Sequence, residues 1–252
     1  MTKIQTLAID IGGTGLKAAV LDQTGKIIGD RARVDTPYPL TPQIFLRTIA
    51  ELVKPLASFD RISAGFPGIV REGIIITAPH FGNDEWHNFP LANALGDHFG
   101  KPARVLNDAE VQGLGAIKGK GLEFVITLGT GLGSALFRDG EPMPHLEFAQ
   151  WMISKKKRFN DYVGNAALHE VGVHKWRRRV GKSIAMFHSL LYYDQIYIGG
   201  GNAHKLSPEV VGDAQTVSNE TGLTGGIHLW GRQISGASKA RVPTPKAPAR
   251  AL

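Results

Sequence analysis

The amino-acid sequence predicts a mixed α/β fold whose second half repeats the plan of the first. Segments with strand-like and helix-like hydrophobic spacing alternate along the chain. One kind of turn, rich in glycine and threonine, follows an apolar run at residues 7–17 and again at 124–134. Small residues in such a turn let backbone N–H groups approach an oxyanion. With 252 residues, the chain can form one large domain or two modest lobes.

The first half is expected to open with three antiparallel strands. Its strands are predicted at residues 4–9, 17–22, 26–32, 61–65 and 103–106. The turn at 22–25 ends in glycine and joins the second strand to the third. Helical spacing of apolar residues predicts helices over 41–57 and 90–99. Thr41 is expected to be the N-cap of the first helix, with Pro42 in its first helical position.

The second half is expected to restart this scheme after a helix over 109–117. Its strands are predicted from residue 124, over 134–137 and over 195–198, with a hairpin at Asp139-Gly140. Further helices are predicted over 163–171 and 175–192. The segment 220–230 contains three glycines, which suits a helix with one end packed on a backbone or a ligand. Residues 232–252 are rich in Ser, Pro, Ala and Lys and are predicted to be a disordered tail.

Composition excludes several classes of function. The chain has no cysteine, which rules out disulfides, thiolate catalysis and cysteine-based zinc sites. No apolar run approaches the roughly 20 residues needed to span a bilayer. The N-terminal residues lack a signal-peptide pattern, so we expect a cytoplasmic protein without a membrane partner. The nine histidines show no ligand spacing, so no protein-held metal is expected.

The formal charge of +7 is concentrated in three basic segments, at 155–158, at 174–179 and in the tail after residue 238. These segments can be solvated helix faces and a disordered tail. They can also form a track for a polyanion, either nucleic acid or a phosphate polymer. Composition alone leaves both readings open.

The first turn has the residue types of a phosphate site. Gly12 and Gly13 open the turn, and Thr14 can donate a hydroxyl hydrogen bond. Asp10, at the end of the preceding strand, could order Mg²⁺ directly or through water. The turn is not a Walker A loop, and it is not a dinucleotide fingerprint because a strand rather than a helix follows it. The alternative is an ordinary glycine-rich hairpin.

Asp108 is the candidate catalytic residue. It lies between the two turns, where a predicted strand ends and a helix begins. A carboxylate there can accept the proton of an attacking hydroxyl during in-line phosphoryl transfer. The alternative is that Asn107 or Asp108 is simply the N-cap of the helix.

Five motifs together resemble those of the ROK family of sugar kinases, in the actin–hexokinase–Hsp70 superfamily. They are Asp10-Ile-Gly-Gly-Thr-Gly-Leu-Lys17, Gly65-Phe-Pro-Gly68, Asn107-Asp108-Ala109, Leu128-Gly-Thr-Gly-Leu-Gly133 and Gly199-Gly-Gly201. The resemblance runs from about residue 2 to residue 231, with order and spacing kept. Within the family the chain is most similar to the polyphosphate glucokinases, which share the basic helix at 175–179 and the ending at 219–230.

The resemblance implies a two-lobed actin-like ATPase (ribonuclease H-like) fold, in which each lobe is a mixed sheet with flanking helices. The N-terminal lobe would span residues 1–108 and the C-terminal lobe 109–231, with the active site between them. It also favours a homodimer.

The resemblance further implies a role for each site residue. Asp108 would be the general base on the 6-hydroxyl of the sugar. The sugar-binding residues would be Gly68, Asn107, Asp108, Glu147 and Gln150. The phosphate- and donor-binding residues would be Asp10, Gly12, Gly13, Thr14, Lys17, Thr130, Gly131, Gly200 and Gly201. Mg²⁺ would accompany the phosphoryl donor.

The expected reaction is transfer of a phosphoryl group to the 6-hydroxyl of glucose or a related hexose, from inorganic polyphosphate, ATP or both. The basic segments 155–158 and 175–179 could form the cationic groove that polyphosphate requires. Two departures on the sugar side stand out, because Gln150 replaces a family histidine and Asn160 replaces a frequent acid. An ATP-only kinase for mannose, fructose or N-acetylglucosamine, or a non-catalytic sugar sensor, are the alternatives.

The family also contains DNA-binding repressors, which carry a helix-turn-helix module before the first phosphate turn. Here that turn begins within ten residues of Met1. We therefore expect no nucleic-acid partner.

Overall fold

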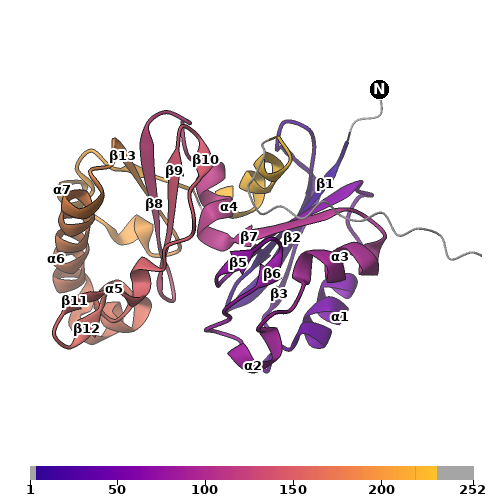
Figure 1. The fold of residues 1–252 in the computed structure, drawn as a ribbon, viewed down its shortest axis with the longest axis horizontal. Coiled ribbons are helices and arrows are strands. Elements are labelled where there is room, and N and C mark those ends of the chain that lie inside the picture. The colour runs from indigo at the N-terminus through magenta and orange to yellow at the C-terminus, as the bar shows by residue number, and fades with distance from the viewer. Residues whose placement is uncertain (1–3, 219, 232–252) are drawn as a thin grey trace, which may run out of the picture.

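The computed structural model describes residues 4–218 and 220–231. It contains two five-stranded mixed sheets, which lie side by side with helix α4 between them (Figure 1). The strand order is β3-β2-β1-β4-β7 in the first sheet and β10-β9-β8-β13-β14 in the second. In each sheet, three sequential strands form an antiparallel meander, and the next two strands run parallel to its first strand. The predicted α/β fold and the repetition of its plan are confirmed.

The first sheet buries apolar residues on both faces, with its larger core cluster on one of them. Its strands are β1 (Thr6–Ile11), β2 (Gly15–Leu21), β3 (Ile27–Asp35), β4 (Arg61–Phe66) and β7 (Ala103–Asn107). Helices α1 (Pro42–Val53) and α3 (Leu91–Phe99) pack their apolar residues into the same core as these strands. A small hairpin of β5 (Val70–Arg71) and β6 (Ile74–Ile75) and the short helix α2 (Asn83–Trp86) complete this part.

Local sequence signals fix the ends of α1. The Thr41 hydroxyl accepts a hydrogen bond from the Ile44 N–H at 3.2 Å, and Pro42 is the first helical residue, as predicted. The helix ends at Val53 rather than at residue 57. Lys54 still has helical backbone angles, but Pro55 has no backbone N–H to continue the hydrogen bonds of the helix. The strands of the first hairpin extend further toward the turn than predicted, since Asp10 and Lys17 pair across it.

The second sheet repeats the arrangement of strands, with one long helix, α6 (Asn165–Leu191), beside it. Its strands are β8 (Leu122–Leu128), β9 (Leu132–Arg138), β10 (Glu141–Pro142), β13 (Gln195–Gly199) and β14 (Gln215–Thr216). Around it lie a hairpin of β11 (Met152–Ser154) and β12 (Lys157–Arg158), helices α5 (Phe159–Val163), α6 (Asn165–Leu191) and α7 (Pro208–Val211), and the 3₁₀ turns η1 (Phe148–Gln150) and η2 (Ala203–Lys205). Helix α6 is interrupted at Gly172, where φ is 73° and ψ is 162°, which matches the two helices predicted around this position.

Helix α4 (Asp108–Leu114) follows β7 of the first sheet directly and packs on β8 and β9 of the second. It ends at Leu114, before Gly115, and so is shorter than the helix predicted over 109–117. Its other neighbours are α8 (Thr221–Thr224) and η3 (Gly225–Leu229) near the end of the described chain.

The segment of α8 and η3 crosses back to the first sheet. Ser63 of β4 donates a hydrogen bond to the Gly226 carbonyl at 2.7 Å and accepts one from the Trp230 indole at 2.8 Å. The guanidinium carbons of Arg61 and Arg104 lie 4.9 Å and 4.6 Å from the centre of the Trp230 ring. A Cβ at Gly225 would overlap the carbonyl oxygen of Val111 in α4. The glycines at 222–226 thus mark a close backbone approach, as predicted.

Residues 221–230 follow the second sheet in the chain and contact β1, β2 and β4 of the first sheet as well as α4. In the part of the chain that the structure describes, no helix has the length and apolarity needed to cross a membrane. The predicted tail, from residue 232, lies outside the described residues.

Candidate active site

The carboxyl ends of the parallel strands β1, β4 and β7 bring Asp10 and Asp108 to one edge of the first sheet. Asp10 pairs in register with Gly65 of β4, and the next residue of β4, Phe66, pairs with Asn107 of β7. Asp108 follows as the first residue of α4. Ligand sites of open α/β sheets form at such strand ends.

Asn107, rather than Asp108, is the N-cap of α4. Its side-chain oxygen accepts hydrogen bonds from the N–H groups of Ala109 at 2.9 Å and Glu110 at 3.3 Å. Glu110 returns the contact, since its carboxylate accepts from the Asn107 N–H at 3.2 Å. The Asn107 amide also donates to the Gly68 carbonyl at 3.0 Å, which ties the loop after β4 to the helix. Capping therefore leaves the carboxyl of Asp108 available for chemistry.

The pKa of Asp108 is raised from 3.8 to about 7. Burial is the largest cause, and the neighbouring charges of Asp10 and Glu147 raise the pKa further. The Ala109 N–H, which donates to Asp108 at 2.8 Å, and the charge of His145 act in the opposite direction. A carboxyl group that titrates near neutral pH is matched to general-base catalysis.

The first glycine turn is held open by contacts from neighbouring elements. The Gly12 carbonyl accepts a hydrogen bond from the Thr36 hydroxyl, and the Gly13 carbonyl accepts one from the Tyr38 hydroxyl, both at 2.6 Å. The ammonium of Lys17 lies 2.8 Å from the Asp10 carboxylate. Thr14, at the tip of the turn, is exposed.

The second and third glycine turns lie against each other. In the second, the carbonyls of Gly129 and Thr130 accept hydrogen bonds from the Asn165 N–H, at 3.1 Å and 3.2 Å. Gly200 and Gly201 precede Asn202, whose N–H donates to the Leu128 carbonyl at 2.8 Å. The structure thereby brings Thr130, Gly131, Gly200 and Gly201 together at one end of the second sheet.

Asn160, grouped with the sugar side in the sequence analysis, supports the second turn. Its side-chain oxygen accepts a hydrogen bond from the Leu132 N–H at 3.1 Å, directly after Gly131. An amide suits this position, because an acceptor for a backbone N–H is what the turn requires. In this structure Asn160 therefore contacts the second glycine turn, after Gly131.

The two polar residues after β10 that were expected to bind sugar differ in environment. The Glu147 side chain is partly buried, and its negative charge helps to raise the pKa of Asp108. Gln150 is exposed, and its side-chain oxygen accepts a hydrogen bond from Arg158 at 2.5 Å. The structure thus brings Glu147, but not the Gln150 amide, to the group around Asp108.

His145 also belongs to this group, and its place near the sugar segment in the sequence predicts a residue that lines the pocket rather than a metal ligand. Its Nδ1 lies 3.0 Å from Glu110, and its Nε2 lies 3.6 Å from Glu147. Burial alone would lower the pKa of His145, but the hydrogen-bond contact with Glu110 and the charges of both carboxylates outweigh it and raise the pKa to about 9. The sequence gives no signal for the pairing of His145 with Glu110, because the segment 143–147 meets α4 only in the folded chain.

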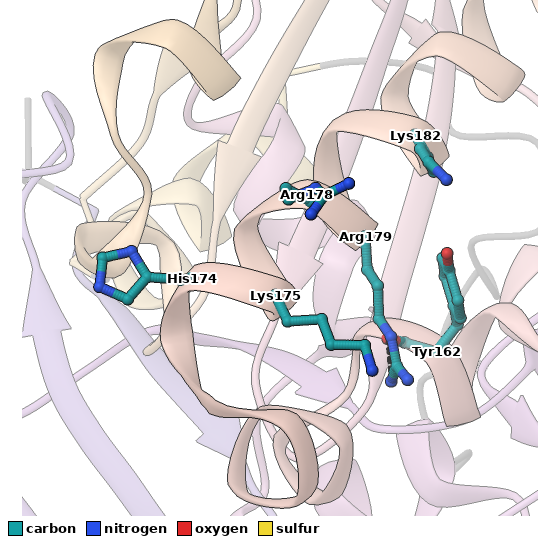
Figure 2. A pocket seen from close by; sticks show the side chains of 6 residues that line it. All are labelled: Tyr162, His174, Lys175, Arg178, Arg179 and Lys182. Atoms are coloured by element: carbon teal, nitrogen blue, oxygen red, sulfur yellow. Dashed lines mark hydrogen bonds between the residues drawn. The ribbon is translucent and has the colours of Figure 1, made fainter.

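A cationic cavity of about 410 Å³ opens beside α6 (Figure 2). It is lined by Tyr162 of α5 and by His174, Lys175, Arg178, Arg179 and Lys182 of α6. Figure 2 shows the side chains of Lys175 and Arg179 pointing toward Tyr162. The Arg179 guanidinium carbon lies 4.8 Å from the centre of the Tyr162 ring.

The four lysine and arginine side chains of this cavity lack acidic partners. Across residues 4–218 and 220–231, none of the four forms a salt bridge. The other basic segment, 155–158, is not part of this lining. Within it, Lys157 lies 3.6 Å from Glu170 and Arg158 contacts Gln150. The predicted groove of two basic segments is thus formed by the helical one alone.

Comparison with known proteins places the chain among sugar kinases. The ROK family model matches residues 6–144. Polyphosphate glucokinase of Mycobacterium tuberculosis (strain CDC 1551 / Oshkosh) is 30% identical over 213 residues, covering 81% of this chain and 80% of that protein.

Solved structures agree with the fold. The inorganic polyphosphate/ATP-glucomannokinase from Arthrobacter sp. strain KM aligns with a TM-score of 0.80 at 28% identity, covering 89% of this chain and 97% of that one. A ROK family glucokinase from Streptomyces griseus, in complex with glucose and AMPPNP, aligns with a TM-score of 0.74 at 20% identity, covering 89% and 98%. These structures share the two-sheet architecture described above.

Proposed function

Because this chain belongs to the ROK family, we propose that it is a kinase that phosphorylates the 6-hydroxyl of glucose, with inorganic polyphosphate, ATP or both as donor. The observation that carries the proposal is the position of Asp108. Its carboxyl group, with a pKa of about 7, lies at the strand ends of the first sheet beside the phosphate-type turn at Asp10. The names of the most similar relatives support the choice of sugar and donor.

In the proposed reaction, ionised Asp108 accepts the proton of the 6-hydroxyl while the hydroxyl oxygen attacks the terminal phosphorus of the donor. The bond between that phosphorus and the bridging oxygen breaks, and the shortened donor leaves. Backbone N–H groups of the turns at Gly13–Thr14 and Thr130–Gly131 stabilise the charge on the transferred group, while the Gly12 N–H donates to the Gly15 carbonyl and shapes the first turn. Asn107, Gly68 and Glu147 hold the sugar, and Gln150 would join them only after releasing Arg158.

Mg²⁺ is proposed to enter with the donor. Within the described residues, no three His, Asp or Glu side chains are grouped to hold a metal ion. A magnesium ion bound mainly by phosphate oxygens and water needs only one or two carboxylates. Asp10 would supply one, next to Lys17, and the ion would neutralise phosphate charge.

A homodimer, favoured by the family resemblance, is part of the same proposal.

The cationic cavity on α6 is proposed to hold the distal phosphates of polyphosphate. Its four unpaired cations follow the spacing i, i+3, i+4, i+7, which places them on one face of the helix. The cavity begins at Tyr162, three residues before Asn165, whose N–H supports the second phosphate turn. A chain of phosphates leaving that turn would therefore meet the cavity next.

The proposed function is tested by assaying glucose 6-phosphate formation with Mg²⁺ and either ATP or polyphosphate. We expect product with at least one donor. Glucose binding without product from either donor would favour a non-catalytic sensor, and product from ATP alone would overturn the polyphosphate assignment.

The rate should depend on pH in the way that a basic Asp108 requires. Below about pH 7, kcat/KM for glucose should fall about tenfold for each pH unit, because the protonated carboxyl cannot accept the hydroxyl proton. Above pH 7 it should level off. A profile that is flat between pH 5 and 7, measured with donor saturating, would contradict the role of Asp108.

Removing positive charges from the cavity should weaken the binding of polyphosphate but not the binding of ATP. In the triple variant Lys175→Ala, Arg178→Ala, Lys182→Ala, we expect KM for polyphosphate to rise while KM for ATP stays unchanged. The slope of log affinity against log salt concentration should decrease by about 2, because three phosphate contacts are lost. The matched control is Lys155→Ala with Lys156→Ala, two exposed lysines outside the cavity. Equal effects of both variants would indicate unspecific attraction.

A further inference from the structure

One ring nitrogen of His145, the buried histidine next to the proposed sugar site, has no hydrogen-bond partner among the described residues. The side chain of His145 is only 6% exposed, and its Nδ1 lies at hydrogen-bond distance, 3.0 Å, from Glu110. Its Nε2 is buried and makes no hydrogen bond within the described structure. A buried polar group in this condition is costly unless a partner reaches it in another state of the protein.

The nearest acceptor is Glu147, whose Oε2 lies 3.6 Å from that nitrogen. This separation exceeds a hydrogen bond by a few tenths of an ångström. The Glu147 side chain is 28% exposed, so it can move by that amount, whereas Glu110 and His145 are fixed by burial. The partnerless nitrogen therefore faces the one carboxylate of the group that can adjust.

His145 also connects two parts of the site that are distant in sequence. Glu110 accepts a hydrogen bond from the Asn107 N–H through one carboxylate oxygen and faces His145 with the other. A continuous series of polar contacts thus runs from the N-cap of α4, beside Asp108, to Glu147 on the segment after β10. The charge of His145 also lowers the pKa of Asp108.

We propose that His145 is a positioning residue for the sugar, and that its Nε2–H donates to Glu147 when the sugar binds. The inference rests on the proposed function, with Glu147 as a sugar ligand. Donation to one oxygen of Glu147 leaves the other free to accept from sugar hydroxyls. It also fixes the position of Glu147 relative to Asn107 and Asp108. His145 acts through Glu147 and does not contact the reacting atoms.

Two substitutions of His145 distinguish the contribution of its Nδ1 from that of its Nε2. In His145→Asn the amide nitrogen reaches about as far as Nδ1, so the contact with Glu110 is kept and that with Glu147 is lost. In His145→Gln the amide nitrogen reaches about as far as Nε2 and can donate to Glu147. We expect His145→Asn to raise KM for glucose about 10- to 100-fold, the usual effect of losing a charge-assisted hydrogen bond. KM for the donor should stay unchanged, and His145→Gln should recover most of the loss.

The matched control is Tyr197→Phe. Its hydroxyl donates to the buried carboxylate of Glu123 at 2.7 Å, and its ring packs with Ala109 and Val111 of α4. This variant removes a buried hydrogen bond to a carboxylate near the same helix without touching the sugar group. We expect a lower melting temperature and an unchanged KM for glucose.

Calorimetric titration of glucose without donor completes the test, because it measures binding independently of turnover. If wild type binds glucose and His145→Asn binds it equally well, the inference is wrong even if the enzyme is a kinase. It is also wrong if His145→Asn raises the KM of both substrates alike. If wild type forms no product but loses glucose affinity in His145→Asn, the proposed function fails and the positioning role stands.

Discussion

Replacing Asp108 by asparagine is expected to lower kcat by about 10²- to 10⁴-fold, the range that a general base contributes. Asparagine has the same shape and can still accept the Ala109 N–H, so the geometry at the start of α4 should persist. It cannot take the proton of the 6-hydroxyl. KM for glucose should change little, because Asn107, Gly68 and Glu147 keep their positions.

The same variant should be at least as stable as wild type at pH 8. Because folding raises the pKa of Asp108 from 3.8 to about 7, the folded state holds its proton more tightly than the unfolded chain does. Wild-type stability from this group is therefore lost as pH rises from about 4 to 7, and stays lost above that. Asp108→Asn removes this cost, so its melting temperature at pH 8 should equal or exceed that of wild type.

The control for Asp108→Asn is Asp97→Asn, an exposed acid on α3, which should change neither kcat nor the melting temperature. Steady-state assays and thermal unfolding on the three proteins decide the matter. An Asp108→Asn enzyme with more than a tenth of wild-type kcat would rule out general-base catalysis by this residue.

Gly68→Ala is expected to lower kcat/KM for glucose by about 10²-fold. Gly68 is buried, and a Cβ there would overlap the carbonyl oxygen of Thr77. Since that oxygen belongs to the backbone, the loop after β4 must shift. The Gly68 carbonyl then moves away from the Asn107 amide, which it meets at 3.0 Å. A displacement of about 1 Å in a substrate-positioning group can cost this much in rate.

In Gly68→Ala, kcat/KM should fall for glucose, while KM for the donor should stay unchanged. The two glycine-threonine turns connect other strands, β1 to β2 and β8 to β9. Overpacking should also lower the free energy of unfolding by about 1–3 kcal/mol. The control is Gly181→Ala in α6, where the nearest atom to the added methyl is Val210 at 3.8 Å. It should be neutral or stabilising, by about 1 kcal/mol at most. Unchanged glucose kinetics in Gly68→Ala would remove this loop from the sugar site.

Local signals in the sequence predicted most of the secondary structure and the position of the phosphate turns. Apolar alternation followed by glycine predicted both meanders, since a strand period and a tight turn are set by neighbouring residues. Thr41 and Pro42 predicted the start of α1 for the same reason. Pro55, which shortens that helix, was also visible but was outweighed by the apolar spacing before it.

Features that depend on tertiary contacts were harder to predict. The return of residues 221–230 to the first sheet depends on Gly225 meeting Val111, and three glycines could show only that something approaches closely. The pairing of His145 with Glu110 joins residues 35 positions apart, and no spacing rule covers such a contact. The two basic segments had equal charge in the sequence. The structure distinguishes them, because Lys157 lies near Glu170 and Arg158 contacts Gln150, whereas Lys175, Arg178 and Arg179 line the cavity on α6.

The return of the chain to the first sheet makes the two lobes inseparable as folding units. The polypeptide crosses between the sheets twice, through α4 and again between β14 and α8. A fragment cut at residue 108 would expose the surface of Ala8, Ala19 and Leu21, which Leu223 and Ile227 cover in the intact chain. Asp108, as the first residue of α4, lies at the start of one of these two crossings, so the proposed catalytic carboxyl is placed by a segment that contacts both sheets.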